Sequence, residues 1–233
     1  MSTSSLHKWT ASVERQLRAL SNSNLPPGGA AYLGTDQEFL NVRAPDLRKL
    51  ARELCDDLPA DWRTCALALW ERHIFDVRNL AVEIAVRHRK DFQKSDWNRF
   101  KPWLDESVGW AMIDRLTTDL YADLLDCFPD YADKCLVWAK SGNLWLRRAS
   151  LAVFCRPARK GQFVEHAFVN LERLAADSDP MIYKAVSWLL RNLTKTHRSL
   201  VEAFLRDHES VLAKLVLREV RTKLETGKKN PKR

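Results

Sequence analysis

The sequence predicts an all-α fold, built as a superhelical stack of antiparallel helical hairpins. It holds only 7 Gly and 9 Pro in 233 residues, about 7% of the chain against a typical ~12%, so helix breakers are few. Apolar residues recur at spacings of three and four nearly end to end, and no alternating stretch is long enough for a strand. Successive pairs of similar helices are typical of a solenoid. A compact bundle is the alternative, because no tight internal sequence repeat is present.

Capping and first-turn signals mark where several helices begin, since a side-chain oxygen there accepts from unpaired backbone N–H groups and Pro is tolerated. They stand at Pro45-Asp46, Ala60-Asp61, Ser95-Asp96, Asn143 and Asp179-Pro180. In chain order, helices are predicted over 6–21, 45–58, 61–73, 76–89, 95–104, 107–126, 129–140, 143–155 and 161–176, and from near Pro180, Thr196 and Glu209. One irregular stretch, 21–43, is centred on Pro26-Pro27-Gly28-Gly29. We expect one domain over 1–226 and a basic, frayed tail over 227–233.

Composition excludes several classes of protein. No apolar run approaches the ~18–20 residues of a membrane span, and the first residues lack the apolar segment of a secretory signal. The five Cys form an odd set without a CxxC pair, which favours reduced thiols in a cytoplasmic protein and argues against a zinc site. No sequence motif for a nucleotide cofactor or a metal is present. We therefore expect no cofactor and no metal.

The charge distribution gives the first indication of function. The formal net charge is +8 and the sequence pI is about 9.4. Seven Lys or Arg lie between Lys134 and Val164, and four between Pro180 and Val201, with no carboxylate in either segment. A surface of one sign is typical of proteins that bind a polyanion. An ordinary basic surface is the alternative.

The helix from Pro180 carries a second face beside its core face. On an ideal helix each residue turns by about 100°, and the apolar residues that fall on one side are Ile182, Val186, Leu189 and Leu193. A narrow stripe on roughly the opposite side holds Lys184, Trp188, Arg191 and Lys195. Trp188 is therefore predicted to be partly exposed between cations, which is typical of a binding residue.

Two further helices show the same separation of faces. Met112, Leu116 and Leu120 mark the buried side of one, and its second stripe holds Trp110, Asp114, Thr117 and Tyr121. Trp110 and Asp114 thus lie one turn apart; an interface Trp beside a solvated Asp is the alternative. In the helix from Asn143, the predicted core residues are Leu146, Ala149 and Val153. Arg148 is expected to point away from them and to be available for phosphate contact.

Tryptophan rings and a carboxylate on a basic surface indicate a cationic target, since a carboxylate repels phosphate. An alkylated purine nucleoside is such a target, because its base is cationic and loss of the base leaves an oxocarbenium-like sugar. Aromatic faces attract cations, and a carboxylate stabilises developing positive charge or orients a water. At ~4 Å and an effective dielectric near 20, this attraction is worth about 4 kcal/mol, or roughly a thousandfold in rate.

From about Tyr32 to Leu224 the chain resembles the AlkD-like DNA glycosylases, a DNA alkylation repair family built from HEAT-like helical repeats. The resemblance rests on Phe39-Leu-Asn-Val-Arg-Ala-Pro45-Asp-Leu-Arg48, Trp110 with Asp114, Asn143-Leu-Trp-Leu-Arg-Arg148, Lys184-Ala-Val-Ser-Trp188-Leu-Leu-Arg191 and Arg218-Glu219-Val. It implies a HEAT-like solenoid with a concave basic DNA-binding face. The implied activity is excision of N3- and N7-alkylated purines from duplex DNA without base flipping, unlike most glycosylases.

The resemblance also implies roles for individual residues. Trp110, Asp114 and Trp188 would form the catalytic cleft, and Arg148 would hold backbone phosphate beside the lesion. Further DNA contacts of the family fall on Tyr32, Arg156 and Arg191. The basic stripe of the helix from Pro180 adds Lys184 and Lys195 as expected DNA contacts. The sequence departs from the family at Ala111, where a polar or acidic residue is common, and in the Pro- and Gly-rich segment before Phe39.

We therefore expect a monomeric, monofunctional DNA glycosylase that uses water as its nucleophile and is cytoplasmic, associating with the nucleoid while bound to DNA. Water is expected because no Lys lies beside Trp110 and Asp114 within their helix turn, where the nearest cation is Arg115. The alternative is a non-catalytic HEAT-like module that binds branched DNA or protein, since the family includes relatives that bind DNA without excising bases.

Overall fold

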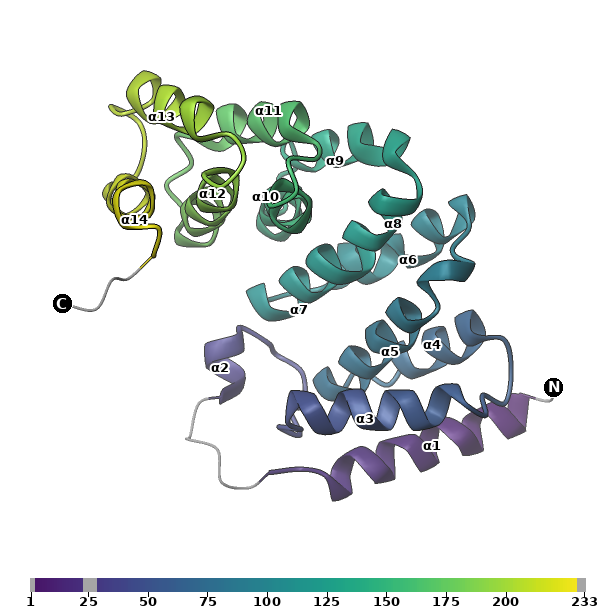
Figure 1. Ribbon diagram of the computed structural model, residues 1–233. Helices are drawn as coiled ribbons and strands as arrows, with labels where there is room; N and C mark the ends of the chain where they lie inside the picture. Colours follow the sequence, from purple (N-terminus) through teal and green to yellow (C-terminus); the bar gives the residue numbers. More distant parts are fainter. Residues whose placement is uncertain (1–2, 23–28, 230–233) are drawn as a thin grey trace. The chain divides into compact units, whose positions relative to one another are not determined.

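The computed structural model describes residues 3–22 and 29–229, and Figure 1 shows that these residues are arranged as a succession of helices. They contain no strand, only the isolated β-bridges Ser21–Val42 and Glu38–Ile74. The all-α class predicted from the helical spacing is confirmed. Pro26, Pro27 and Gly28, and the last part of the predicted tail, 230–233, lie outside the described residues. Within the described residues no helix has the length and apolar character needed to cross a membrane.

The chain forms two compact units, Met1–Leu124 and Leu125–Arg233. The first contains α1 (Thr3–Ala19), α2 (Gly29–Leu33), α3 (Ala44–Cys55), α4 (Trp62–Trp70), α5 (Phe75–Arg87), η1 (Arg89–Asp91), α6 (Lys94–Glu106), α7 (Trp110–Arg115) and the π-helical turn η2 (Leu116–Tyr121). The unit boundary falls within α8 (Ala122–Cys127). The second contains η3 (Pro129–Tyr131), α9 (Ala132–Trp138), α10 (Leu144–Ala158), α11 (Val164–Leu174), α12 (Pro180–Leu193), α13 (Arg198–Asp207) and α14 (Lys214–Thr226).

Helix α5 is the centre of the first unit. It is buried along most of its length and packs against α3, α4 and η2. Asp76, in its first turn, accepts hydrogen bonds from the backbone N–H groups of Leu40 (2.7 Å) and Val42 (2.9 Å). Burial raises the pKa of Asp76, although these backbone hydrogen bonds act in the opposite direction. The buried carboxylate thus holds the segment before α3 against α5.

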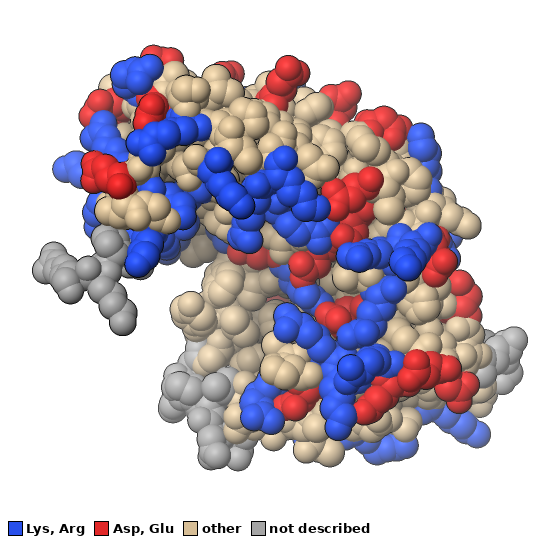
Figure 2. All heavy atoms as spheres, in the orientation of Figure 1, with Lys and Arg blue, Asp and Glu red and all other residues tan. Residues whose placement is uncertain are grey.

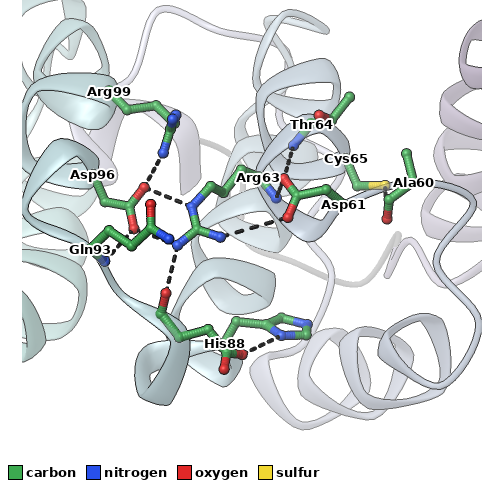
Figure 3. A network of polar contacts seen from close by, with 10 residues as sticks. Ala60, Asp61, Arg63, Thr64, Cys65, His88, Gln93, Asp96 and Arg99 are labelled. Atoms are coloured by element: carbon green, nitrogen blue, oxygen red, sulfur yellow. Dashed lines mark hydrogen bonds and ion pairs between the residues drawn. The ribbon is translucent and has the colours of Figure 1, made fainter.

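A buried network of charges joins α4 to α6 in the same unit (Figure 3). Both carboxylate oxygens of the fully buried Asp96 accept from Arg63, each over 2.8 Å, and Arg99 also contacts Asp96. Burial alone raises the pKa of Asp96, but the hydrogen bonds from Arg63 and the backbone of Gln93 outweigh it, so the pKa lies below its usual range. Arg63 and Arg99 therefore have an internal partner.

In the second unit α10 and α12 pack against each other, with α9 and α11 against α10 and α14 against α12. The core residues predicted for α12, Ile182, Val186, Leu189 and Leu193, are all buried, as expected. Predicted N-caps are confirmed where side chains accept from the first turn: Asp61 from Arg63 N–H, Asn143 from Trp145 N–H, and Asp179 from Met181 N–H.

Several boundaries differ from the predictions. The stretch 21–43 is not wholly irregular, because it contains α2. Helix α14 begins at Lys214 and not near Glu209. The helix predicted from residue 107 begins at Trp110, because Gly109 has a φ of 92°, a conformation that an α-helix cannot include.

Candidate functional site

Trp110 and Tyr32, two predicted site residues far apart in the sequence, lie in contact in the first unit. The indole Nε1–H of Trp110 donates a hydrogen bond to the backbone carbonyl of Tyr32 over 2.7 Å. Their rings meet edge to face, with centroids 5.5 Å apart and planes at 82°. The Tyr32 side chain is 75% exposed, whereas Trp110 is half-buried. The structure therefore places an exposed phenol beside an indole whose orientation is fixed by the protein.

Two glycines make this contact possible. Gly34 follows α2 and Gly109 precedes α7, and both have positive φ, 71° and 92°. A Cβ at Gly34 would lie 3.2 Å from Gly109 Cα, and a Cβ at Gly109 would lie 2.2 Å from the Gly34 carbonyl oxygen. The two backbones pack directly on each other. Helical spacing does not predict this pair; an isolated Gly immediately before Trp110 is the signal in the sequence that marks it.

Asp114 lies on α7, one turn after Trp110, and is half-buried. The predicted core residues of this segment, Met112, Leu116 and Leu120, are all buried. Arg115, the nearest cation in the sequence, contacts the carboxylates of Glu83 and Asp119. Its charge is thus engaged by acids other than Asp114.

The prediction that the second stripe continues from Asp114 to Thr117 and Tyr121 is wrong, since both of these residues are fully buried. Both residues lie in η2, which begins at Leu116. A π-helical turn forms its hydrogen bonds over five residues instead of four, so the 100° per residue of an α-helix no longer holds. Thr117 donates from Oγ1 to the Ile113 carbonyl over 2.7 Å instead of facing outward.

In the second unit, Trp188 is half-buried on α12 while the core stripe of that helix is fully buried, as predicted. Lys184, one turn before it, and Lys195, just past the helix, are exposed. Arg191 is more enclosed: its Nε donates to Ser187 Oγ over 3.2 Å and lies 3.5 Å from a Glu219 carboxylate oxygen. Burial lowers the pKa of Arg191, although Glu219 acts against this.

Arg148 differs from the expectation that it points away from the core. Its side chain is only 6% exposed, and its Nη1 donates to the Met181 carbonyl over 2.6 Å. Helix α10 is covered by α9, α11 and α12, so the side opposite its apolar stripe is also enclosed. Leu146, by contrast, was expected in the core and is only half-buried. Arg156 lies on the same helix, 3.4 Å from Asp126.

Basic side chains gather on part of the second unit's surface. On the face shown in Figure 2, Lys and Arg lie over α10, α12 and α14. Trp188 thus has an exposed cation, Lys184, one turn away on its own helix. Among the described residues no group of three or more acidic, His or Cys side chains is arranged to hold a metal ion.

The motif from Phe39 to Arg48 lines a cavity of about 290 Å³ in the first unit. Apolar side chains, Phe39, Leu47 and Phe75 among them, form much of its wall. Leu33 and Arg115, the neighbours of Tyr32 and Asp114 in the sequence, also line it. This motif therefore lines a cavity that residues of α2 and α7 also border.

Comparison with known proteins gives a family and a fold. A family model described as DNA alkylation repair enzyme matches residues 13–224. No curated protein sequence matches significantly. One similar solved structure, a predicted DNA alkylation repair enzyme from Enterococcus faecalis, has 18% identity and a TM-score of 0.76, covering 88% of this chain and 97% of that one. Another, AlkD2 from Streptococcus mutans, has 17% identity and a TM-score of 0.65, covering 95% and 98%. These similarities confirm the predicted helical-repeat fold class.

Proposed function

Since the chain belongs to the DNA alkylation repair enzyme family, whose model matches residues 13–224, we propose that it is a monofunctional DNA glycosylase. Its role is DNA repair and its partner is DNA. The substrate we propose is duplex DNA carrying N3- or N7-alkylated purines, on which the protein acts as a monomer. One observation supports this most directly: a half-buried carboxylate, Asp114, lies one turn from a half-buried tryptophan, Trp110, whose indole the protein holds in place.

In this proposal Asp114 stabilises the positive charge that develops on the sugar. Water adds its oxygen to C1′, the C1′–N bond breaks, and its electron pair neutralises the cationic purine as it leaves; the proton from water passes to solvent. Trp110 and Trp188 supply ring faces that attract the cationic nucleoside. Arg115 is engaged by Glu83 and Asp119 and does not neutralise Asp114 in this scheme.

Phosphate binding is assigned first to Lys184 and Lys195. Both are exposed, and neither has an ion-pair partner among the described residues. Arg191 and Arg156 face carboxylates, Glu219 and Asp126, so each must exchange an internal partner for a phosphate. We keep both as DNA contacts, together with Tyr32 and Arg148, and expect the lysines to contribute more to the salt dependence of binding.

The test is release of free base from methylated duplex DNA, measured by chromatography under single-turnover conditions. We expect 3-methyl- or 7-methylpurines to appear together with abasic DNA, and no covalent protein–DNA adduct on reduction with borohydride. A trapped adduct would show that an amine of the protein, and not water, is the nucleophile. Tight DNA binding without any base release would instead favour the non-catalytic module, for which binding to branched DNA is the next measurement.

A further inference from the structure

We propose that α2 is the positioning element of Trp110, and that the Gly34–Gly109 contact is the joint that holds it there. The inference rests on the proposed function, and it assigns roles to two glycines and to the Tyr32 carbonyl. Three observations converge on it: the Trp110–Tyr32 hydrogen bond of 2.7 Å, the edge-to-face packing of their rings at 5.5 Å, and the direct packing of two glycine backbones. All of these groups belong to the first unit.

The hydrogen bond decides which part of Trp110 can act on DNA. An indole has a single N–H and no acceptor, and here that N–H is directed to the Tyr32 carbonyl. The indole therefore has no donor left for a base or a phosphate. Its contribution is the ring face, which attracts a cation, held in one orientation by a backbone group that no side-chain substitution removes.

The glycine pair allows the two segments to approach closely enough for this bond. A Cβ at Gly109 would fall 2.6 Å from the Gly34 carbonyl carbon, where there is no space for it, and a Cβ at Gly34 would fall 3.2 Å from Gly109 Cα, a tight contact, and 3.7 Å from the Trp110 ring atom Cδ1, an ordinary one. A methyl group at Gly34 thus presses on the backbone of Gly109, the residue that directly precedes Trp110. Separating the two segments lengthens the Trp110–Tyr32 hydrogen bond first, because this bond is made beside the joint.

Gly34→Ala is the informative variant, and the chain supplies a matched control. Gly227 has the same φ of 71°, and a Cβ there meets nothing within 4 Å. Gly34→Ala and Gly227→Ala therefore both place a Cβ at a positive φ that disfavours it, and only the first disturbs α2 and α7. We expect Gly34→Ala to lower single-turnover base release about tenfold to a hundredfold. Gly227→Ala should keep the wild-type rate and the wild-type affinity for undamaged DNA, whereas Gly34→Ala, which also shifts the DNA-contacting Tyr32, should lower that affinity by less than it lowers base release.

A second readout does not depend on activity. The indole N–H resonance of Trp110, identified by its loss in Trp110→Phe, should exchange slowly with solvent in the wild type and in Gly227→Ala, and quickly in Gly34→Ala. Because Trp110→Phe keeps a ring but removes the donor, the double variant Trp110→Phe/Gly34→Ala should be no slower in base release than the slower single variant.

Three results overturn the proposal: wild-type base release by Gly34→Ala, loss of base release with the indole N–H still protected, or additive losses in the double variant. If the wild-type protein releases no base, the proposed glycosylase function is rejected, but the proposed role of α2 is not. The exchange of the Trp110 indole N–H then still decides whether α2 positions this ring, and unchanged exchange in Gly34→Ala rejects it. If Gly34→Ala does not fold, the rate of base release by Trp110→Phe, which lacks the indole N–H, tests the proposal instead. A wild-type rate for Trp110→Phe excludes any need for the hydrogen bond.

Discussion

The guanidinium of Arg148 donates a hydrogen bond to the backbone carbonyl of Met181 over 2.6 Å, which ties α10 to the first turn of α12. Trp188 lies farther along that same helix. A residue assigned to DNA phosphate thus also holds in place the helix that carries a proposed catalytic ring. Hydrogen bonds that involve a charged group contribute about 1.5–3 kcal/mol, so this contact matters for the position of α12.

Arg148→Ala separates the two roles of this residue. Loss of the bond to Met181 should lower the free energy of unfolding by about 1.5–3 kcal/mol. If Arg148 also contacts phosphate, binding weakens for all sequences and the slope of log affinity against log salt falls by about 0.9. Urea denaturation and DNA titrations at several salt concentrations measure the two effects. A loss of stability with an unchanged slope would make Arg148 a structural residue only.

Asp114→Asn should separate catalysis from binding. Removing a carboxylate that repels phosphate leaves the affinity for undamaged DNA equal or slightly better. Base release should fall by two to three orders of magnitude, on an attraction of about 4 kcal/mol discounted for partial solvation. Asp119→Asn is the matched control, because it removes the same charge from a carboxylate that faces Arg115. Near wild-type base release by Asp114→Asn would reject the electrostatic role.

Trp188→Ala should impair base release while lowering the free energy of unfolding by less than the loss of a buried Trp would. A half-buried ring contributes less than the ~3–5 kcal/mol lost when a buried Trp is truncated. The neighbouring Leu189 is fully buried, so Leu189→Ala should cost about 2–5 kcal/mol and serves as the comparison in the same helix. A larger loss of stability for Trp188→Ala than for Leu189→Ala would place Trp188 in the core.

Asp96 should make stability depend on pH in the acid range. Its pKa in the folded protein lies below the ordinary value, so its stabilisation is complete above the unfolded pKa of about 3.9 and is lost as pH falls through the lower folded value. Asp96→Asn should cost about 3 kcal/mol at pH 7, since it leaves Arg63 without its buried partner, and the difference from wild type should shrink below pH 4. Asp91→Asn, an exposed carboxylate of the same cluster, should change stability by less than about 1 kcal/mol.

Helical spacing predicts much of this fold because the packed face of each helix is a property of nearby residues. The buried stripe of α12 and the half-burial of Trp188 follow from the positions of four apolar side chains on one ideal helix. The caps at Asp61, Asn143 and Asp179 are likewise local, since each accepts from a residue only two positions ahead.

Other features depend on groups far apart in the sequence, and local spacing does not contain them. The direction of Arg148 follows from its own helix, but its burial follows from the helices around α10. The docking of α2 requires Gly109, which lies in another part of the chain. The roles of Asp114 and Trp188 in base release stay predictions, because they concern a substrate and not the packing of the protein.

The π-helical turn η2, which follows the helix that carries Asp114, changes the angle by which successive residues turn about the helix axis. The half-buried Trp110 and Asp114 precede this turn and the buried Thr117 and Tyr121 lie within it, although all four fall on one stripe of an ideal helix. Because a π-helical turn accommodates one extra residue, deleting a single residue within 116–121 should restore regular α-helical hydrogen bonding and leave the helix that follows on nearly the same face.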